Sequence, residues 1–279
     1  MSTPTLNNRV IVLFDEFGNP TFRPDRHSDS FLGVSVVYQL EAENHIFEQC
    51  DVIFGLSNLA PVKNDRIGTS RAEGISELIC SLPIQVTISS IDLSNTNLQR
   101  VVNLYEDFGA ELRRLHRGVS PRLTAHILHD NILDDTLFEA MGRYLGEEPV
   151  ATEFEISIDD WPIPSSDIDI ALQYRSASFT QKLSEIYEEL GIPVTLSVSP
   201  IQRMSQDSKR KRFIDVTTSA VSRHFFPQDH RKYSPTPLRN ILGIGHNRYA
   251  ELTERTIEFL RGAMDAFSRN PGPKSSDGY

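Results

Sequence analysis

Runs of apolar residues, bounded by turn-forming residues, recur along this chain and predict buried strands. Residues 9–15 and 31–38 are such runs, and both are rich in β-branched side chains, which favour strands. The link between them contains Gly18 and Pro24, so the two strands are predicted to form a hairpin with a long loop. Residues 84–91 instead alternate between apolar and polar positions, and this pattern predicts a strand with one exposed face.

Apolar residues also recur at spacings of three and four, and this period predicts helices. The predicted helices span residues 42–54, 168–190, 208–226 and 247–268, and a helical insertion is predicted at about 97–148. Gly191 is expected to end the second of these helices as its C-cap. Ser205 or Asp207 is expected to cap the start of the third helix.

A strand, a helix and another strand follow one another between residues 153 and 199. Phe154, Ile156 and Ile158 alternate along the first strand, and residues 193–199 form the second. A strand–helix–strand unit of this length joins two parallel strands by a right-handed connection. The sequence therefore predicts an α/β fold with a sheet flanked by helices.

The composition supports one globular domain. Apolar residues make up 39% and aromatic residues 9% of the 279 residues, which is enough for a core. We expect a single domain over residues 9–268 and a disordered tail at 269–279. The sequence shows no long apolar run and no signal-peptide pattern, so a soluble cytoplasmic protein is expected. Two cysteines, Cys50 and Cys80, are too few for a disulfide scaffold or a cysteine zinc site.

Acidic residues stand where predicted strands end. Asp15 and Glu16 follow the first apolar run, and Asp159 ends the strand that begins near residue 153. A buried carboxylate without a partner is costly, and a bound divalent cation is one of the few groups that makes an acidic cluster favourable. Side chains alternate along a strand, so at most one of Asp15 and Glu16 faces a given site. The alternative is that both acids lie solvated in a turn.

A third carboxylate, Asp215, lies on the predicted helix that follows the strand–helix–strand unit. Two-metal phosphoryl transfer needs several carboxylates on rigid elements, around ions that lie ~3.5–4 Å apart. Two strand ends and the flank of a helix can supply them. The hypothesis is that Asp15, Asp159 and Asp215 bind one or two Mg²⁺ or Mn²⁺ ions, with Glu16 as an auxiliary ligand or as a group behind the ligands.

Several segments of the chain resemble the domain-of-unknown-function 3800 family. The segment Phe14–Asn19 is similar to the Asp-Glu-Ser-Gly-Asp opening of that family. Phe17 stands where the family usually has Ser, and Asn19 stands where it usually has its second Asp. Residues 31–37 resemble the second strand of the family.

The later part of the chain extends this resemblance over residues 9–226. Asp159 matches the Asp at the end of a later strand of the family. Residues 208–221 resemble its closing helix, in which an Asp, here Asp215, is followed by small residues. A fourth acid, which such folds often carry between the first and middle strands, has Glu73 and Glu77 as its candidates.

The resemblance implies a ribonuclease-H-like mixed sheet flanked by helices. It also implies a metal-dependent nuclease that hydrolyses phosphodiester bonds in RNA or DNA. Some relatives are linked to mobile elements and antiphage defence, so a role there is implied as well. The alternative is a catalytically inactive ribonuclease-H-like module that binds or regulates a protein partner within a larger complex. Loss of Mn²⁺ binding on Asp15→Asn is expected only of the active form.

Basic residues give a candidate surface for nucleic acid, although the net charge of −10 argues against a broad polyanion binder. Arg203, Lys209, Lys211 and Arg212 are predicted to contact phosphates beside Asp215. Four consecutive charges at 209–212 point all around a helix. The alternative is therefore that these side chains are ordinary solvated surface.

Two other patterns favour ordinary explanations over ligand sites. His126 and His129 have a spacing that suits a metal on a helix, but a surface helix with two histidines is the preferred interpretation. Gly243 and Gly245 faintly resemble an anion-binding loop before a helix. A clear crossover strand does not precede them, so a linker turn is predicted.

Overall fold

The computed structural model describes residues 8–18, 30–54, 69–92, 123–147, 150–159, 165–205, 207–225 and 242–244. Contacts group the chain into two compact units, of which the first lies within residues 1–18, 32–90 and 132–245. The site described below belongs to this first unit, as do the described residues other than 30–31, 91–92 and 123–131. The single domain predicted over residues 9–268 stays a prediction, and the tail at 269–279 lies outside the described residues.

The described strands form one mixed sheet. Their order is β5-β4-β1-β2-β3-β7, and β6 pairs with β4. Strand β1 pairs antiparallel with β2 and parallel with β4, and β4 pairs parallel with β5 and β6. The strands are β1 (Asn8–Phe17), β2 (Ser30–Gln39), β3 (Gln85–Asp92), β4 (Thr152–Ile158), β5 (Leu196–Val198), β6 (Gln202–Arg203) and β7 (Leu242–Ile244).

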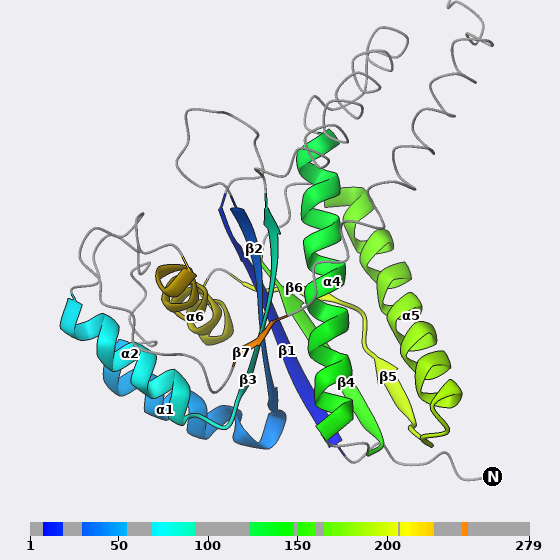
Figure 1. Cartoon of the computed structure of the whole chain (residues 1–279), viewed down its shortest axis with the longest axis horizontal. Helices are drawn as coiled ribbons and strands as arrows, with labels where there is room; N and C mark the ends of the chain where they lie inside the picture. The colour runs from blue at the N-terminus through cyan, green and yellow to red at the C-terminus, as the bar shows by residue number, and fades with distance from the viewer. Residues whose placement is uncertain are drawn as a thin grey trace, which may run out of the picture. The chain divides into compact units, whose positions relative to one another are not determined.

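Helices cover both faces of this sheet, so the predicted α/β class is confirmed. Figure 1 shows α1, α2 and α6 on one face and α4 and α5 on the other. Among the described helices, none is long and apolar enough to cross a membrane. The helices are η1 (Leu40–Ala42), α1 (Glu43–Phe54), α2 (Thr69–Ser81), α4 (Leu123–Glu147), α5 (Ser165–Glu189) and α6 (Lys209–Phe225).

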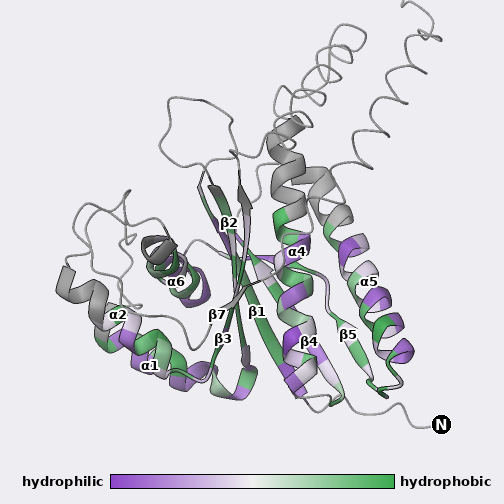
Figure 2. Ribbon diagram, viewed as in Figure 1, coloured by the Kyte–Doolittle hydropathy of each residue, from purple (hydrophilic) through white to green (hydrophobic). Residues whose placement is uncertain are grey.

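Strand β1 lies inside the sheet and is buried on both faces. Ile11 and Leu13 belong to an apolar cluster with side chains of α1, α2 and α6. Val10, Val12 and Phe14 alternate with them and therefore point to the opposite face. All five side chains are at most 2% exposed, and Figure 2 shows the strands coloured mainly as hydrophobic. The centre of the sheet is thus fixed by packing on two sides.

Most predicted elements are confirmed where the structure describes them. The strands at 9–15 and 31–38 are β1 and β2, and they pair antiparallel as a hairpin requires. The unit between residues 153 and 199 is β4, α5 and β5, with parallel strands. The helix expected at 42–54 is η1 and α1, and that at 208–226 is α6.

Other predicted helices fall partly or wholly outside the described residues. Of the insertion at about 97–148, the structure describes α4, which is helical throughout. The helix predicted at 247–268 lies outside the described residues. Gly191 ends α5 as predicted, with φ of 68°. The N–H of Ile192 donates to the carbonyl of Tyr187 at 2.9 Å, as in a Schellman C-cap.

The strand at 84–91 was predicted to be half exposed, and this is wrong. Val86 and Ile88 pack in the cluster that includes α2, but Thr87 and Ser89 are also buried, at 1% and 7% exposure. Gln85 shares a face with the two polar residues, and its amide donates to Glu147 of α4 at 2.7 Å. A helix therefore covers the polar face as well, which alternation along one strand cannot reveal.

Two local predictions are also wrong. The linker turn at Gly243 is part of a strand, because Leu242–Ile244 pairs parallel with Val86–Ile88. The cap of α6 is Ser208 rather than Ser205 or Asp207, since its Oγ accepts a hydrogen bond from the N–H of Lys211 at 3.1 Å. The first error arises because a short strand is determined by its partner strand, and the second because three capping residues stand close together before the helix.

The close contact of α4 with the sheet gives a first prediction, at Gly33 of β2. A Cβ at this position would lie 2.4 Å from Thr136 Oγ1 and 2.9 Å from Ile132 Cγ1. The Thr136 hydroxyl cannot turn away freely, because it donates to the carbonyl of Ile132 at 2.6 Å. We expect Gly33→Ala to destabilise the protein by ~1–3 kcal/mol, measured by urea unfolding.

Gly142, in the C-terminal part of α4, is the matched control. A Cβ there has no atom within 4 Å. Gly142→Ala is therefore expected to stabilise the protein by ~0.5–1 kcal/mol, the ordinary gain in a helix. Equal effects of the two substitutions would show that helix α4 does not approach β2 as closely as described.

Candidate metal centre

Two of the three predicted acids lie side by side on neighbouring parallel strands. Phe14 of β1 is in register with Ile158 of β4, so the next residues, Asp15 and Asp159, are adjacent. Asp15 follows Ile11 and Leu13 at intervals of two and points to the same face of the sheet, which α6 covers. The carboxyl ends of two parallel strands thus bring both acids beneath one helix.

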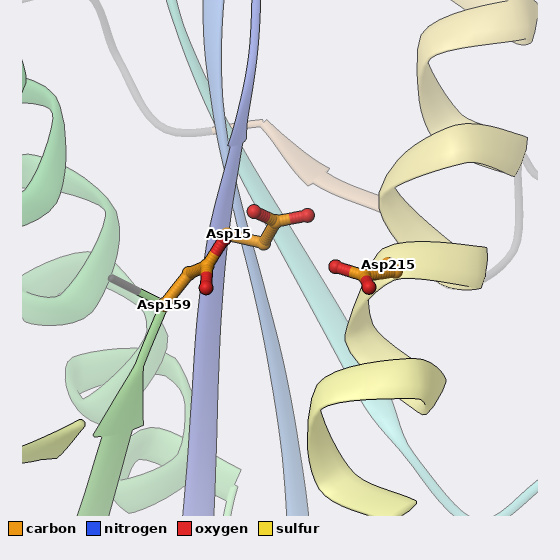
Figure 3. Close-up of side chains that lie close together, drawn as sticks. All are labelled: Asp15, Asp159 and Asp215. Carbon is orange, nitrogen blue, oxygen red and sulfur yellow. The ribbon is translucent and has the colours of Figure 1, made fainter. Parts of the chain in front are cut away.

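Helix α6 supplies the third acid. Its sequence combines a Ser208 cap with fully buried Phe213, Ile214 and Val221, which join the apolar cluster under the sheet face. This packing turns Asp215 toward the strand ends. Carboxylate oxygens of Asp15, Asp159 and Asp215 all lie within 4.8 Å of one another, and Figure 3 shows the three side chains gathered around one region. The predicted convergence of these acids is therefore confirmed.

The acids are not equally exposed. Asp15 is buried, at 8% exposure, whereas the side chains of Asp159 and Asp215 are 30% and 37% exposed. The cluster thus has a closed side at β1 and a side open to solvent. This arrangement can admit a small ion from solvent to a buried carboxylate.

Lys211 lies within the acidic cluster. Its Nζ is 2.8 Å from Asp159 Oδ2 and also donates to Asp215 Oδ1. The side chain is 8% exposed, so it is a buried counter-ion and not a surface charge. The sequence contained one signal for this contact, because Lys211 and Asp215 are four residues apart on a helix.

Burial and charge alter the pKa values in the cluster. Burial raises the pKa of Asp15 from its ordinary 3.8 to about 7, and the charges of Asp215 and Asp159 add to this while Lys211 opposes it. Burial also raises the pKa of Asp215, against the hydrogen bond from Lys211. For Lys211, burial alone would lower the pKa, but the three acids outweigh it and hold it above its usual range.

A second ion-pair network fixes the start of α6. Arg210 donates to Glu43 of α1 at 2.7 Å and to Glu155 of β4 at 2.5 Å. The hydroxyl of Tyr38 also donates to Glu43, at 2.9 Å. These contacts join α6, α1, β4 and β2, and sequence reasoning did not anticipate them. Their role is to hold the helix that carries Lys211 and Asp215.

The remaining predicted acids lie elsewhere. Glu16 pairs in register with Gly33, which faces α4, so Glu16 points away from Asp15. The three-acid group found among the described residues does not include it. Glu77 is exposed on α2, and the side chain of Glu73 lies outside the described residues. The geometry therefore supports three ligands and gives no support to a fourth.

The predicted basic surface divides into two parts. Arg203 on β6 and Lys209 at the start of α6 are exposed. As whole residues, Lys211 and Arg212 are each 6% exposed, so the alternative that the whole run is ordinary solvated surface is wrong for them, and their contact with phosphates stays a prediction. The reason is that α6 packs on the sheet with a broad face of its own surface, which includes residues 211–214. The side chains of His126 and His129 lie outside the described residues.

The donor set fits a hard divalent cation. Carboxylate oxygens are the ligands that Mg²⁺ and Mn²⁺ prefer, and three carboxylates lie close enough to share an ion. The cluster of Asp15, Asp159 and Asp215 can therefore hold a metal ion. Lys211 already balances part of the charge, so an ion would bind in competition with it or beside it.

Comparisons with known proteins do not assign this chain to a family. A scan of protein-family models and a search of curated proteins each found no match to this chain.

Stability of the ion-free protein is predicted to depend on pH through Asp15. Its folded-state pKa of about 7 exceeds the ordinary 3.8, so the folded state binds more protons between these values. Stability should therefore fall as pH rises from about 4 through 7, by up to ~1.4 kcal/mol per pH unit for one group. Asp15→Asn has no such proton to lose, so it should be as stable as the wild type below about pH 4 and increasingly more stable as the pH rises to 8.

Thermal melts in a metal chelator at several pH values provide the measurement. If Asp15 were instead a turn acid accepting backbone hydrogen bonds, its substitution would destabilise the protein by ~1 kcal/mol or more at every pH. A variant that melts lower than the wild type at pH 8 would contradict the cluster assignment.

Proposed function

We propose that this protein is a metal-dependent nuclease that hydrolyses phosphodiester bonds in RNA or DNA. The observation that carries the proposal is the convergence of Asp15, Asp159 and Asp215 within 4.8 Å on two strand ends and a helix. These residues would hold one or two Mg²⁺ or Mn²⁺ ions. When bound, such ions supply activation of a water and stabilisation of the leaving oxygen.

The chain itself contributes rigid placement and a partly desolvated site. Asp15 is held on a strand that is buried on both faces, so its carboxylate has little freedom to move. Asp159 and Asp215 line the side open to solvent, where a phosphodiester can approach. This division suits a site that binds a large, charged substrate at its surface and holds one metal-ligating carboxylate, Asp15, in the interior.

We also propose the ribonuclease-H-like assignment. Two features support it. The sheet is mixed, with β1 antiparallel to β2 and parallel to β4. The acids that resemble the domain-of-unknown-function 3800 motifs are the ones that meet at one site. Motifs that are far apart in sequence and similar to one family are expected to converge only if the fold of that family is shared.

The second candidate is an inactive binding or regulatory module, and one observation favours it. Lys211 bridges Asp159 and Asp215, so the cluster already has an internal counter-ion. In this alternative the ion pairs of Lys211 only stabilise the folded structure, and Mn²⁺ should not bind. Calorimetric titration with Mn²⁺ separates the two candidates without knowledge of the substrate.

Activity should depend on the acids of the cluster and not on other acids nearby. Asp15→Asn is expected to reduce Mn²⁺-dependent cleavage of mixed RNA and DNA substrates by at least ~100-fold, because a neutral amide is a poor ligand for a hard cation. Asp207→Asn removes an exposed carboxylate near the start of α6 and is the matched control. Retained cleavage in Asp15→Asn would overturn the assignment.

The exposed part of the basic surface should contact phosphates. A double variant, Arg203→Ala with Lys209→Ala, is expected to weaken binding to all nucleic-acid sequences alike and to reduce the salt dependence by about two phosphate contacts. Its melting temperature should change little, because exposed charges contribute little to stability.

The control for this surface is Lys182→Ala, which removes an exposed charge from α5 on the other face of the sheet. Fluorescence anisotropy at several salt concentrations gives affinity and slope together. An unchanged slope in the double variant would mean that Arg203 and Lys209 are ordinary solvated surface.

A further inference from the structure

Lys211 occupies the position that a metal ion would need. Its ammonium contacts Asp159 and Asp215 directly, and its positive charge also interacts electrostatically with Asp15. A divalent ion bound by the three acids would draw on the same carboxylates, two of which Lys211 contacts. Two cations that share ligands at this distance repel each other strongly in a partly buried site.

We infer that Lys211 is a built-in cation that fills the acidic cluster of the ion-free protein and that divalent-ion binding displaces it. This inference rests on the proposed metal site and adds to it a competitor carried by the chain. Lys211 is thereby a positioning residue, because it holds three mutually repelling acids together until an ion arrives.

The surroundings of Lys211 allow such a displacement. The ammonium is bound on the open side of the cluster, where Asp159 and Asp215 are about one third exposed. The backbone of Lys211 is fixed by the Ser208 cap, but its side chain has four rotatable bonds between Cα and Cε, and each of them can move the ammonium group. Rotation about these bonds can move the charge to solvent while α6 stays in place.

Competition predicts opposite effects of one substitution on metal affinity and on ion-free stability. Lys211→Met keeps an unbranched apolar stem as far as Cε but removes the charged Nζ. The variant should bind Mn²⁺ at least ~10-fold more tightly than the wild type, because no ammonium must leave. Without an ion its melting temperature should fall, because the repulsion among the acids is no longer balanced.

Calorimetric titration of the full chain with MnCl₂, beside thermal melts with and without Mn²⁺, tests the inference. Lys182→Met is the matched control, since it removes an exposed charge far in sequence from the acids, and its affinity should stay within about twofold of the wild type. An unchanged or weaker affinity in Lys211→Met, with Mn²⁺ binding to the wild type, would overturn the inference and leave the proposed metal site standing. No Mn²⁺ binding to either protein would overturn both.

A measurement on the wild type keeps the inference testable if Lys211→Met does not fold. An amine-acetylating reagent followed by mass spectrometry reports the accessibility of each lysine. Lys211 should be labelled more slowly than Lys182 in a chelator and should become at least ~10-fold more reactive with saturating MnCl₂, because its amine leaves the acids and becomes accessible to the reagent. Protection of Lys211 that persists with Mn²⁺ bound would overturn displacement.

Discussion

Repulsion among three carboxylates is the constraint on which the described site depends. Their oxygens lie within 4.8 Å of one another, and such a group disfavours its own charged form. The acids do not create this arrangement, because each is held by packing of other residues. Ile11 and Leu13 fix the strand of Asp15, and Phe213 fixes the helix of Asp215. The apolar core therefore supplies the stability that allows the acids to remain close.

Helix α6 connects the charge cluster to the rest of the fold. Arg210 and Lys211 are consecutive, yet they bind different acids, namely Glu155 of β4 and Asp159, which directly follows β4. These acids are four residues apart and lie ~13 Å apart along a strand. Two attachments at this separation resist both sliding and rotation of α6 over the sheet. The position of Asp215 is thus determined at the start of its helix as well as by the core beneath it.

The sequence predicted those parts of the structure in which local pattern and tertiary context agree. Continuous apolar runs identified β1 and β2, because such runs are stable only in buried strands. Acids placed at the ends of predicted strands identified Asp15 and Asp159. Partnerships across the fold were harder to predict. Thr87 is buried by α4, and Gly243 lies in a strand because β3 pairs with it. Lys211 is predicted to contact phosphates and not the acids of the cluster, since a run of basic residues does not show which side chain the helix buries.

Asp15 and Lys211 respond differently to pH, and this difference separates the two processes that accompany ion binding, namely loss of a proton from Asp15 and displacement of the Lys211 ammonium. Asp15 has a pKa of about 7, so an ion that binds below this pH must also displace a proton from it. The pKa of Lys211 lies above its usual range, so its ammonium stays charged and competes equally at every pH near neutrality. A change of metal affinity with pH below 7 therefore reports on Asp15. A difference in metal affinity between the wild type and Lys211→Met that is the same at every pH reports on Lys211. The buried acid and the buried base thus leave distinct signatures in the same titration, although they belong to one cluster.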